Sequence, residues 1–250
     1  MRKIILEKLR GIEEAEGIRI LHAVESGSRA WGFPSPDSDY DVRFIYVRPR
    51  EDYLRLDKRR DVVEYPIDEV LDISGWDLDK TLRLLHASNP TLFEWSQSPI
   101  VYKATEQFQA CLPTIWTYFA AKSGLWHYLS TAEGNYRGCL KGERVRAKKY
   151  FYVLRPLLAC RWILERGTPP PMRFAELVET QLDRPLRPVV EELLRCKMSA
   201  PEVGEVPRVD VLNVFIEENL VALRTKIEAL PREKQREWGP LNDMFLSALA

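Results

Sequence analysis

Two short groups of residues near the start of the chain have the types and spacing to do chemistry on a phosphate. The first is Gly27-Ser28; ten residues further on comes the second, Asp39 and Asp41, with one residue between them. Glycine lets the backbone approach an anion closely, and serine adds an N–H and a hydroxyl donor. Paired carboxylates are hard oxygen ligands that suit Mg²⁺, which often bridges carboxylates to substrate phosphates. The two groups therefore predict a pocket for a metal ion and a phosphate.

The surrounding residues predict the strands that position these groups. Residues 18–24 form a short apolar, β-branched run, typical of a buried strand. Residues 27–38, rich in Gly, Ser and Pro, predict a loop. Residues 39–47 predict a second strand, whose alternation places both aspartates and Arg43 on one face. Two carboxylates on one face repel each other and are costly to bury, so they are expected to share a cation.

Further strands and then helices follow along the chain. "DVVEYPI" and "DEVLDISGW" predict two strands around Pro66. In the latter, Leu71 and Ile73 would face the core, whereas Val70, Asp72 and Ser74 would face away. After Asp77, which can cap a helix, the apolar period changes to that of helices. Helical patterns cover residues 2–15, 105–130, 143–166, 173–182, 186–197 and 210–230.

This order predicts an α+β fold, with a small mixed β-sheet and flanking helices followed by an all-helical C-terminal domain. We place the boundary near 105, with the domain at 1–105 carrying the predicted metal and phosphate pocket and a helical domain, expected to bind the substrate, at 106–250. A chain of 250 residues is long enough for two such domains.

Composition narrows the function classes. Lys and Arg number 37 and Asp and Glu number 37, so no global charge points to a polyanion partner. No stretch approaches the roughly 20 apolar residues that span a bilayer, and the first residues do not resemble a signal peptide. We expect a cytoplasmic protein with no membrane partner. The four widely spaced cysteines predict buried free thiols and no zinc site.

Longer strings around these motifs carry a family resemblance. Gly27, Ser28, Asp39 and Asp41 resemble the signature of the DNA polymerase beta-like nucleotidyltransferase superfamily. "ESGSRAWGFPSPDSDYDVRFIYV", "DISGWDLDKTLRLLHASNPTLFEW", "SPIVY" and "KKYFYVLRPLLACRWI" are similar to the predicted nucleotidyltransferase family linked to RNA repair pathways. The resemblance runs over most of residues 18–175.

The resemblance implies a two-metal nucleotidyl transfer with Mg²⁺, or Mn²⁺, as cofactor and an NTP as substrate. Asp39 and Asp41 would hold both ions, and a third carboxylate would come from a neighbouring strand. We assign this role to Asp72, which faces away from the core; Glu64 and Asp68 are the weaker candidates. Gly27, Ser28 and the positive charge of Arg29 would hold the phosphates.

A second candidate binding region lies in the helical half. Residues 137–161 contain eight basic residues and one acid, a local charge of +7. On a helix, Arg144, Lys148, Tyr152 and Arg155 would share one face. With the resemblance, Lys148 and Arg155 are expected to contact the triphosphate and Tyr152 a base or sugar. The alternative is a solvated basic face that binds nothing.

The sequence thus predicts an enzyme that transfers NMP from an NTP to a hydroxyl, with an RNA end as the acceptor, and releases pyrophosphate. A small molecule or a protein hydroxyl remains an alternative acceptor. Two other classes stay open: a non-catalytic nucleotide- or RNA-binding module of the same fold, and a Mg²⁺-dependent nuclease. The phosphate-binding corner argues against the nuclease, and retention of the repulsive aspartate pair argues against the module.

Overall fold

A computed structural model describes residues 1–66, 70–199, 205–231, 233–234 and 236–250. The chain forms two compact units, and each is described by itself. The first comprises Met1–Ala30, Asp39–Phe119 and Gln235–Ala250, and the second comprises Trp31–Ser38 and Ala120–Lys234. The domain boundary at 105 stays a prediction; the compact units change over at Phe119 and again near residue 235.

A five-stranded mixed sheet forms the centre of the first unit, as the sequence predicts. Its order is β3-β4-β2-β1-β5. Strands β2 and β4 are parallel, and the other neighbouring pairs are antiparallel. The strands are β1 (Arg19–Glu25), β2 (Tyr40–Val47), β3 (Val62–Glu64), β4 (Leu71–Asp77) and β5 (Val101–Ala104). The central position of β2 puts the predicted aspartate strand directly beside both β1 and β4.

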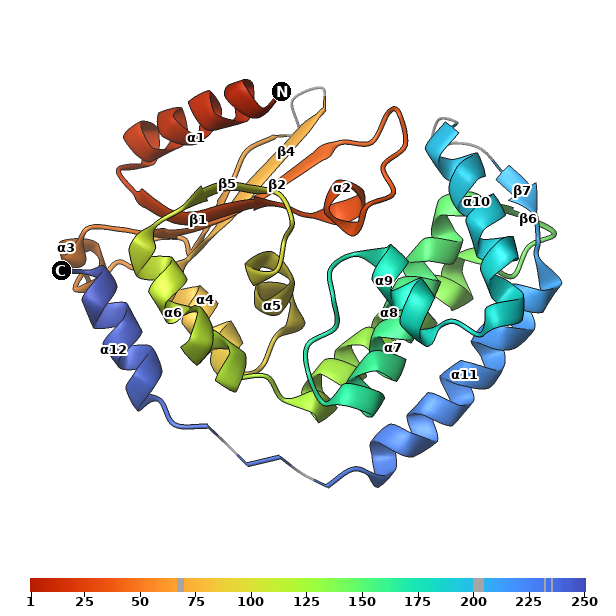
Figure 1. Ribbon diagram of the computed structural model, residues 1–250. Coiled ribbons are helices and arrows are strands. Elements are labelled where there is room, and N and C mark those ends of the chain that lie inside the picture. Colours follow the sequence, from red (N-terminus) through yellow and green to blue (C-terminus); the bar gives the residue numbers. More distant parts are fainter. Residues whose placement is uncertain (67–69, 200–204, 232, 235) are drawn as a thin grey trace. The chain divides into compact units, whose positions relative to one another are not determined.

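Helices cover both faces of this sheet (Figure 1). Helix α1 (Arg2–Glu16) lies on one face, where buried Ile5, Leu9 and Ile12 pack against apolar side chains of β1, β2 and β4. The other face is covered by α4 (Leu78–His86), α5 (Pro90–Ser96) and α6 (Glu106–Thr117). The alternation predicted for β4 is confirmed, since Leu71 and Ile73 are buried in the α1-side core.

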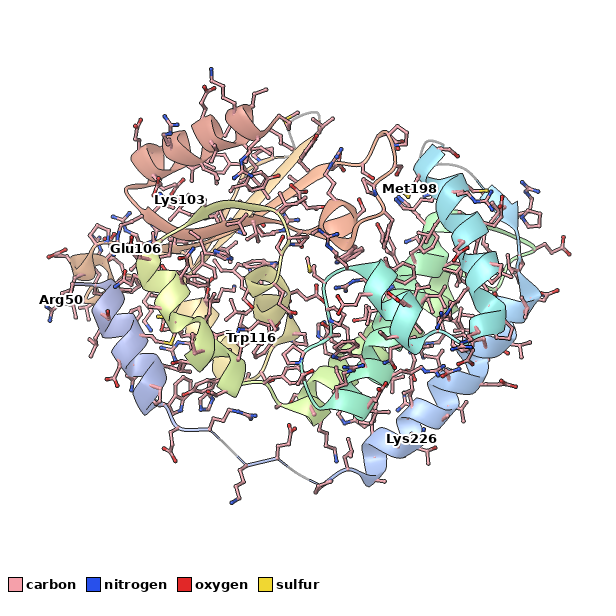
Figure 2. All side chains as sticks on the ribbon, in the orientation of Figure 1. Arg50, Lys103, Glu106, Trp116, Met198 and Lys226 are labelled. Atoms are coloured by element: carbon pink, nitrogen blue, oxygen red, sulfur yellow. The ribbon has the colours of Figure 1, made fainter. Side chains whose placement is uncertain are left out.

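Polar side chains fix the ends of several of these elements. Asp77 caps α4, as predicted, by accepting a hydrogen bond from the Asp79 N–H at 2.9 Å. Lys103 on β5, labelled in Figure 2, donates from Nζ to both carboxylate oxygens of Glu13 on α1, at 2.6 and 2.8 Å. Short helix α3 (Arg50–Tyr53) follows β2, and α12 (Gly239–Ala248) packs against α4 and α6.

The second unit is helical apart from a short ribbon. Helices α7 (Ala121–Cys139) and α8 (Ala147–Arg166) pack along each other, and α8 also contacts α9 (Phe174–Gln181), α10 (Arg187–Ser199) and α11 (Asp210–Ala229). A 3₁₀ turn spans Arg184–Leu186, and β6 (Arg144–Arg146) pairs with β7 (Glu205–Pro207). One face of α8 is buried through Ala147, Phe151, Leu154 and Leu158, as the apolar spacing of these residues on a helix predicts.

Three details of the predicted elements are wrong. The helix predicted from 143 begins at Ala147, because residues 144–146 pair with β7 instead. The helix predicted over 105–130 is two helices, α6 and α7. Part of the predicted loop forms the one-turn helix α2 (Gly27–Trp31).

Asn89-Pro90 follows the end of α4 and starts α5. The Asn89 side chain accepts the Thr91 N–H at 2.9 Å, and proline suits the first turn of a helix.

The remaining structural expectations concern cysteines, aromatic residues and membranes. All four cysteines are free, but only Cys160 is buried. Tyr128, Tyr136 and Tyr150 are core residues, as expected for aromatics at helical spacing. Within the described parts of the chain, none of the helices has the length and apolar character to cross a membrane.

Candidate active site

The predicted phosphate corner and the aspartate strand are neighbours in the first unit. β1 and β2 pair so that Glu25 lies opposite Val42, and the chain turns into α2 immediately after Glu25. The Ser26 N–H donates to the Asp41 carbonyl at 2.8 Å. This bond ties the start of the corner to the backbone of the residue predicted to be catalytic.

Gly27 adjoins the Asp41 side chain itself. Its φ is +59°, a left-handed conformation that favours glycine. A Cβ at this position would lie 2.0 Å from Oδ2 of Asp41 and 2.8 Å from its Cγ. The sequence therefore needs glycine here twice over, once for the backbone and once to leave room for the carboxylate.

Asp41 and Asp72 come together across neighbouring strands. The parallel pairing of β2 and β4 puts the two residues in register. Arg43 Nη2 donates to Oδ1 of Asp41 at 3.1 Å and to Oδ2 of Asp72 at 2.7 Å, so one nitrogen contacts both carboxylates. The three side chains are between 19% and 32% exposed. The structure thus brings together two of the three predicted carboxylates, with their charge shared by one guanidinium.

Asp39 and the basic residue of the corner lie beside this pair along the chain. Asp39 is exposed and immediately precedes β2, whose first residue is Tyr40. Arg29 donates from Nε to the Asp39 carbonyl at 3.0 Å, and its guanidinium lies 3.7 Å from the centre of the Tyr40 ring. Ser28, by contrast, is 7% exposed. Arg29 therefore links the corner to the start of the aspartate strand.

Glu25 is a site residue that the sequence reasoning missed. Its carboxylate is completely buried, accepts the Asp41 N–H at 2.8 Å through Oε1 and accepts the Tyr102 hydroxyl through Oε2. Burial raises the pKa of Glu25, and the hydrogen bonds from Tyr102 and from the Asp41 backbone oppose that rise. The available signal was an acid ending an otherwise apolar strand. Glu25 therefore holds the backbone of Asp41 in place through this hydrogen bond.

The other carboxylates weighed as the third ligand are placed differently. Glu64 lies on edge strand β3, where its side chain is 54% exposed and pairs with Arg60. Asp77 lies at the far end of β4 and is occupied as the helix cap. Asp68 lies outside the described residues. Among the candidates that the structure describes, Asp72 is the one in register with Asp41.

The donor set of the pair suits a hard metal ion. Across the described ranges, no three His, Cys, Asp or Glu side chains converge closely enough to hold a metal by themselves. Mg²⁺ commonly needs only one or two carboxylates, because water and substrate phosphates complete its shell. Asp41 and Asp72 fit this requirement, because they lie in register on neighbouring strands and contact the same nitrogen of Arg43. The Arg43 guanidinium supplies positive charge to these two carboxylates, as a metal bound to them also would.

The model of the RNA repair pathway DNA polymerase beta family, RlaP, matches residues 1–247. The chain belongs to this family. A relative from Bacillus subtilis (strain 168), named "Uncharacterized protein YcgL", is 44% identical over 251 residues, which cover 100% of this chain and 96% of the relative. Membership in RlaP, together with the mixed sheet and its flanking helices, indicates a polymerase beta-like nucleotidyltransferase.

A solved structure also shows a weak likeness. The crystal structure of a nucleotidyltransferase-like protein from Exiguobacterium sibiricum 255-15 aligns with 90% of this chain and 75% of its own, at 14% identity and a TM-score of 0.32. At that score the likeness carries no argument about this RlaP chain.

The predicted nucleotide-binding residues of the helical half lie in the second unit, where Lys148, Tyr152 and Arg155 follow helical spacing on α8 and Arg144 does not belong to that helix. Arg144 belongs to β6 and is exposed, whereas Lys148 and Tyr152 on α8 are half-buried. Arg155 is only 4% exposed, and its guanidinium lies 4.5 Å from the centre of the Trp31 ring. The predicted face was wrong for Arg144 alone, because the helix begins at Ala147 and Arg144 lies in β6. Their roles toward a nucleotide stay predictions.

The loop between the corner and the aspartates is held within the second unit by α10. Lys197 is 5% exposed, and its Nζ donates to the Phe33 carbonyl at 2.8 Å and to Ser35 Oγ at 3.2 Å. The Phe33 ring packs against the rings of Phe151 and Phe174, with centres 5.2 and 5.4 Å away. The loop that joins Gly27-Ser28 to Asp39 and Asp41 thus packs within the helical unit over residues Trp31–Ser38.

Proposed function

We propose that this RlaP chain transfers a nucleoside monophosphate from an NTP to a hydroxyl group, that the acceptor is an RNA end, and that pyrophosphate is released. One observation carries the proposal: Asp41 and Asp72 contact the same nitrogen of Arg43 directly beside the glycine corner. A pair of adjacent acids next to a backbone that can approach an anion suits a bound triphosphate and its counter-ion.

The transfer forms a bond between the acceptor oxygen and the α-phosphorus and breaks the bond from the α-phosphorus to the bridging oxygen of the pyrophosphate. The acceptor hydroxyl loses its proton, and the leaving pyrophosphate takes the electron pair. In the proposal, the N–H groups and hydroxyl at Gly27-Ser28 bind phosphate oxygens, and Arg29 adds positive charge beside them. Glu25 holds the Asp41 backbone in place through the 2.8 Å hydrogen bond.

Mg²⁺, or Mn²⁺, would be held by Asp41 and Asp72, with Asp39 as the third proposed ligand, and would lower the pKa of the acceptor hydroxyl and stabilise charge on the phosphates. Arg43 would stabilise the two acids when no metal is bound. Its guanidinium contacts both of them and so reduces the repulsion between their negative charges.

The RNA acceptor is supported by the family and by basic residues of the second unit. Arg137, Lys141, Arg144 and Arg146 are exposed and could contact a phosphate backbone. Lys148 and Tyr152 are proposed to contact the triphosphate and the base or sugar. Arg155 would contribute only after its contact with Trp31 opens, because its side chain is buried there.

The test is incubation of the full chain with each NTP labelled at the α-phosphate, Mg²⁺ and a mixed RNA pool. Label on RNA supports the proposal. Shortened RNA without label would instead show a nuclease, and binding without transfer would show a non-catalytic module. Asp41→Asn and Asp72→Asn are expected to abolish transfer. The matched control is Glu64→Gln, an exposed carboxylate on the neighbouring strand, which should keep it; loss in this control would contradict the assignment of Asp72.

A further inference from the structure

A polar cavity lies in the first unit, at the opposite end of the strands from the candidate active site. Its volume is about 230 Å³. Arg48 follows the last residue of β2 and Asp77 ends β4, whereas Asp41 and Asp72 lie at the starts of these strands. At about 3.3 Å per residue, roughly 20 Å separates the two ends. The cavity is therefore a different place from the proposed nucleotide site.

Arg48 is a buried cation in the lining of this cavity. The residue is 7% exposed, and its Nε has no hydrogen-bond acceptor among the described residues. The nearest acid is Asp77, whose Oδ2 is 3.8 Å from that nitrogen, beyond hydrogen-bond range. Nη1 reaches the Glu16 carbonyl at 3.5 Å, the outer limit of such a bond. A buried guanidinium with an unused donor is costly unless a ligand supplies an acceptor.

The acids of the lining are already occupied. Asp77 Oδ1 accepts the Tyr53 hydroxyl at 2.9 Å and also caps α4. Asp52 pairs with Arg59 Nε at 3.1 Å. In the same way Asp79 pairs with Arg83 Nε at 2.9 Å and Asp61 with Lys80 at 3.2 Å. Each of these contacts engages one oxygen of its carboxylate, and the partners of Asp52 and Asp79 are cations of the same lining.

The cations, by contrast, retain donors. A guanidinium has five N–H groups, and the ion pairs of Arg59 and Arg83 engage Nε of each. Lys58, also in the lining, is exposed and forms no ion pair with any described residue. The three guanidiniums and Lys58 together have more N–H donors than the four lining carboxylates have oxygens, although the formal charges balance. An acceptor-only ligand matches such a lining, and a phosphate group offers several acceptor oxygens.

We infer that this cavity binds a small phosphate anion through Arg48, Lys58, Arg59 and Arg83, independently of the candidate active site. Arg48 would provide the buried contact, and the three more exposed cations would close around the remaining oxygens. The inference does not depend on the proposed transfer activity, because the residues of the two places do not overlap.

The experiment titrates inorganic phosphate into the full chain, followed by calorimetry and by the ¹⁵N–¹H signals of arginine Nε groups. Binding with a shift of the Arg48 Nε signal is expected. Lys58→Met and Arg59→Gln, both at exposed side chains, should each weaken binding at least about tenfold, because each removes a charge-assisted contact. Arg48→Lys should weaken it too while keeping the buried charge.

The controls separate this site from the other one and from general charge effects. Arg50→Gln changes an exposed arginine close by that is not in the lining, and should bind phosphate like the unmodified chain. Asp41→Asn should also leave phosphate binding unchanged. No binding at millimolar phosphate, equal weakening by Arg50→Gln and Arg59→Gln, or loss in Asp41→Asn with retention in Arg59→Gln would each overturn the inference.

Discussion

Replacing Gly27 with alanine tests whether the glycine corner positions Asp41, the carboxylate proposed to be catalytic. The new Cβ would lie 2.0 Å from Asp41 Oδ2, and side-chain contacts of a real Cβ essentially never fall below 3.0 Å. The carboxylate must therefore move by about 1 Å or more, which would also break its 3.1 Å contact with Arg43. A displacement of that size can lower the rate of a positioned reaction about 100-fold.

Backbone strain must be separated from this displacement, and the chain offers a matched control. Gly17, which ends α1, has φ +60°, almost the same as the +59° of Gly27, but a Cβ there would meet nothing within 4 Å. Each alanine substitution is expected to lower the free energy of unfolding by about 1–2 kcal/mol through the left-handed backbone. Only Gly27→Ala should also lose transfer.

The assay compares the two variants by urea denaturation and by transfer of α-labelled NMP at saturating NTP. We expect Gly17→Ala to transfer at the rate of the unmodified chain once it is folded, and Gly27→Ala to transfer about 100-fold more slowly. Equal rates in the two folded variants would refute the positioning role of the corner.

Three further predictions follow from the contacts around the site. Burial raises the pKa of Glu25 above its ordinary 4.5, so the contribution of Glu25 to stability is full below pH 4.5 and is lost as the pH rises through the folded pKa. The unfolding free energy of the unmodified chain minus that of Glu25→Gln should therefore fall as the pH rises through this window. A difference that does not change with pH would contradict the prediction. Arg43→Met should lower the free energy of unfolding by about 1 kcal/mol, because its two ion pairs are partly exposed. Mg²⁺ should raise the melting temperature of this variant more than that of the unmodified chain, because Arg43 no longer contacts the two acids. An equal rise in both proteins would place the metal elsewhere. Lys197→Met removes the donor to the buried Phe33 carbonyl, so the free energy of unfolding should fall by about 1–3 kcal/mol. The backbone amides of residues 33–38 should also exchange faster. Unchanged exchange would show that Lys197 does not hold this loop in place.

Local patterns in the sequence predicted the strands of the site well. The apolar run at 18–24 corresponds to β1, and the alternation on 39–47 and around Asp72 gave the correct faces of β2 and β4. These predictions succeed because one buried face imposes a period of two on a strand. The pairing of Asp41 with Asp72, however, depends on the register of two parallel strands distant in sequence, which periodicity alone does not encode.

Other features depended on tertiary contacts that a local pattern does not contain. Residues 144–146 have a helical pattern but pair with β7, some 60 residues later in the chain, so Arg144 does not join the predicted face of α8. Glu25 was missed because its partners, Tyr102 and the Asp41 N–H, come from two other strands. Arg43 was placed on the correct face, but its contact with both acids requires the neighbouring strand.

The most direct measurement follows two labels in one reaction: an NTP labelled at both the α- and γ-phosphates, incubated with Mg²⁺, the RNA pool and either the unmodified chain or Asp41→Asn. The account predicts that the α-label is found on the RNA and the γ-label in pyrophosphate, in equal molar amounts. With Asp41→Asn, neither labelled RNA nor labelled pyrophosphate should form. Appearance of the γ-label on RNA, or equal transfer by Asp41→Asn, would contradict it.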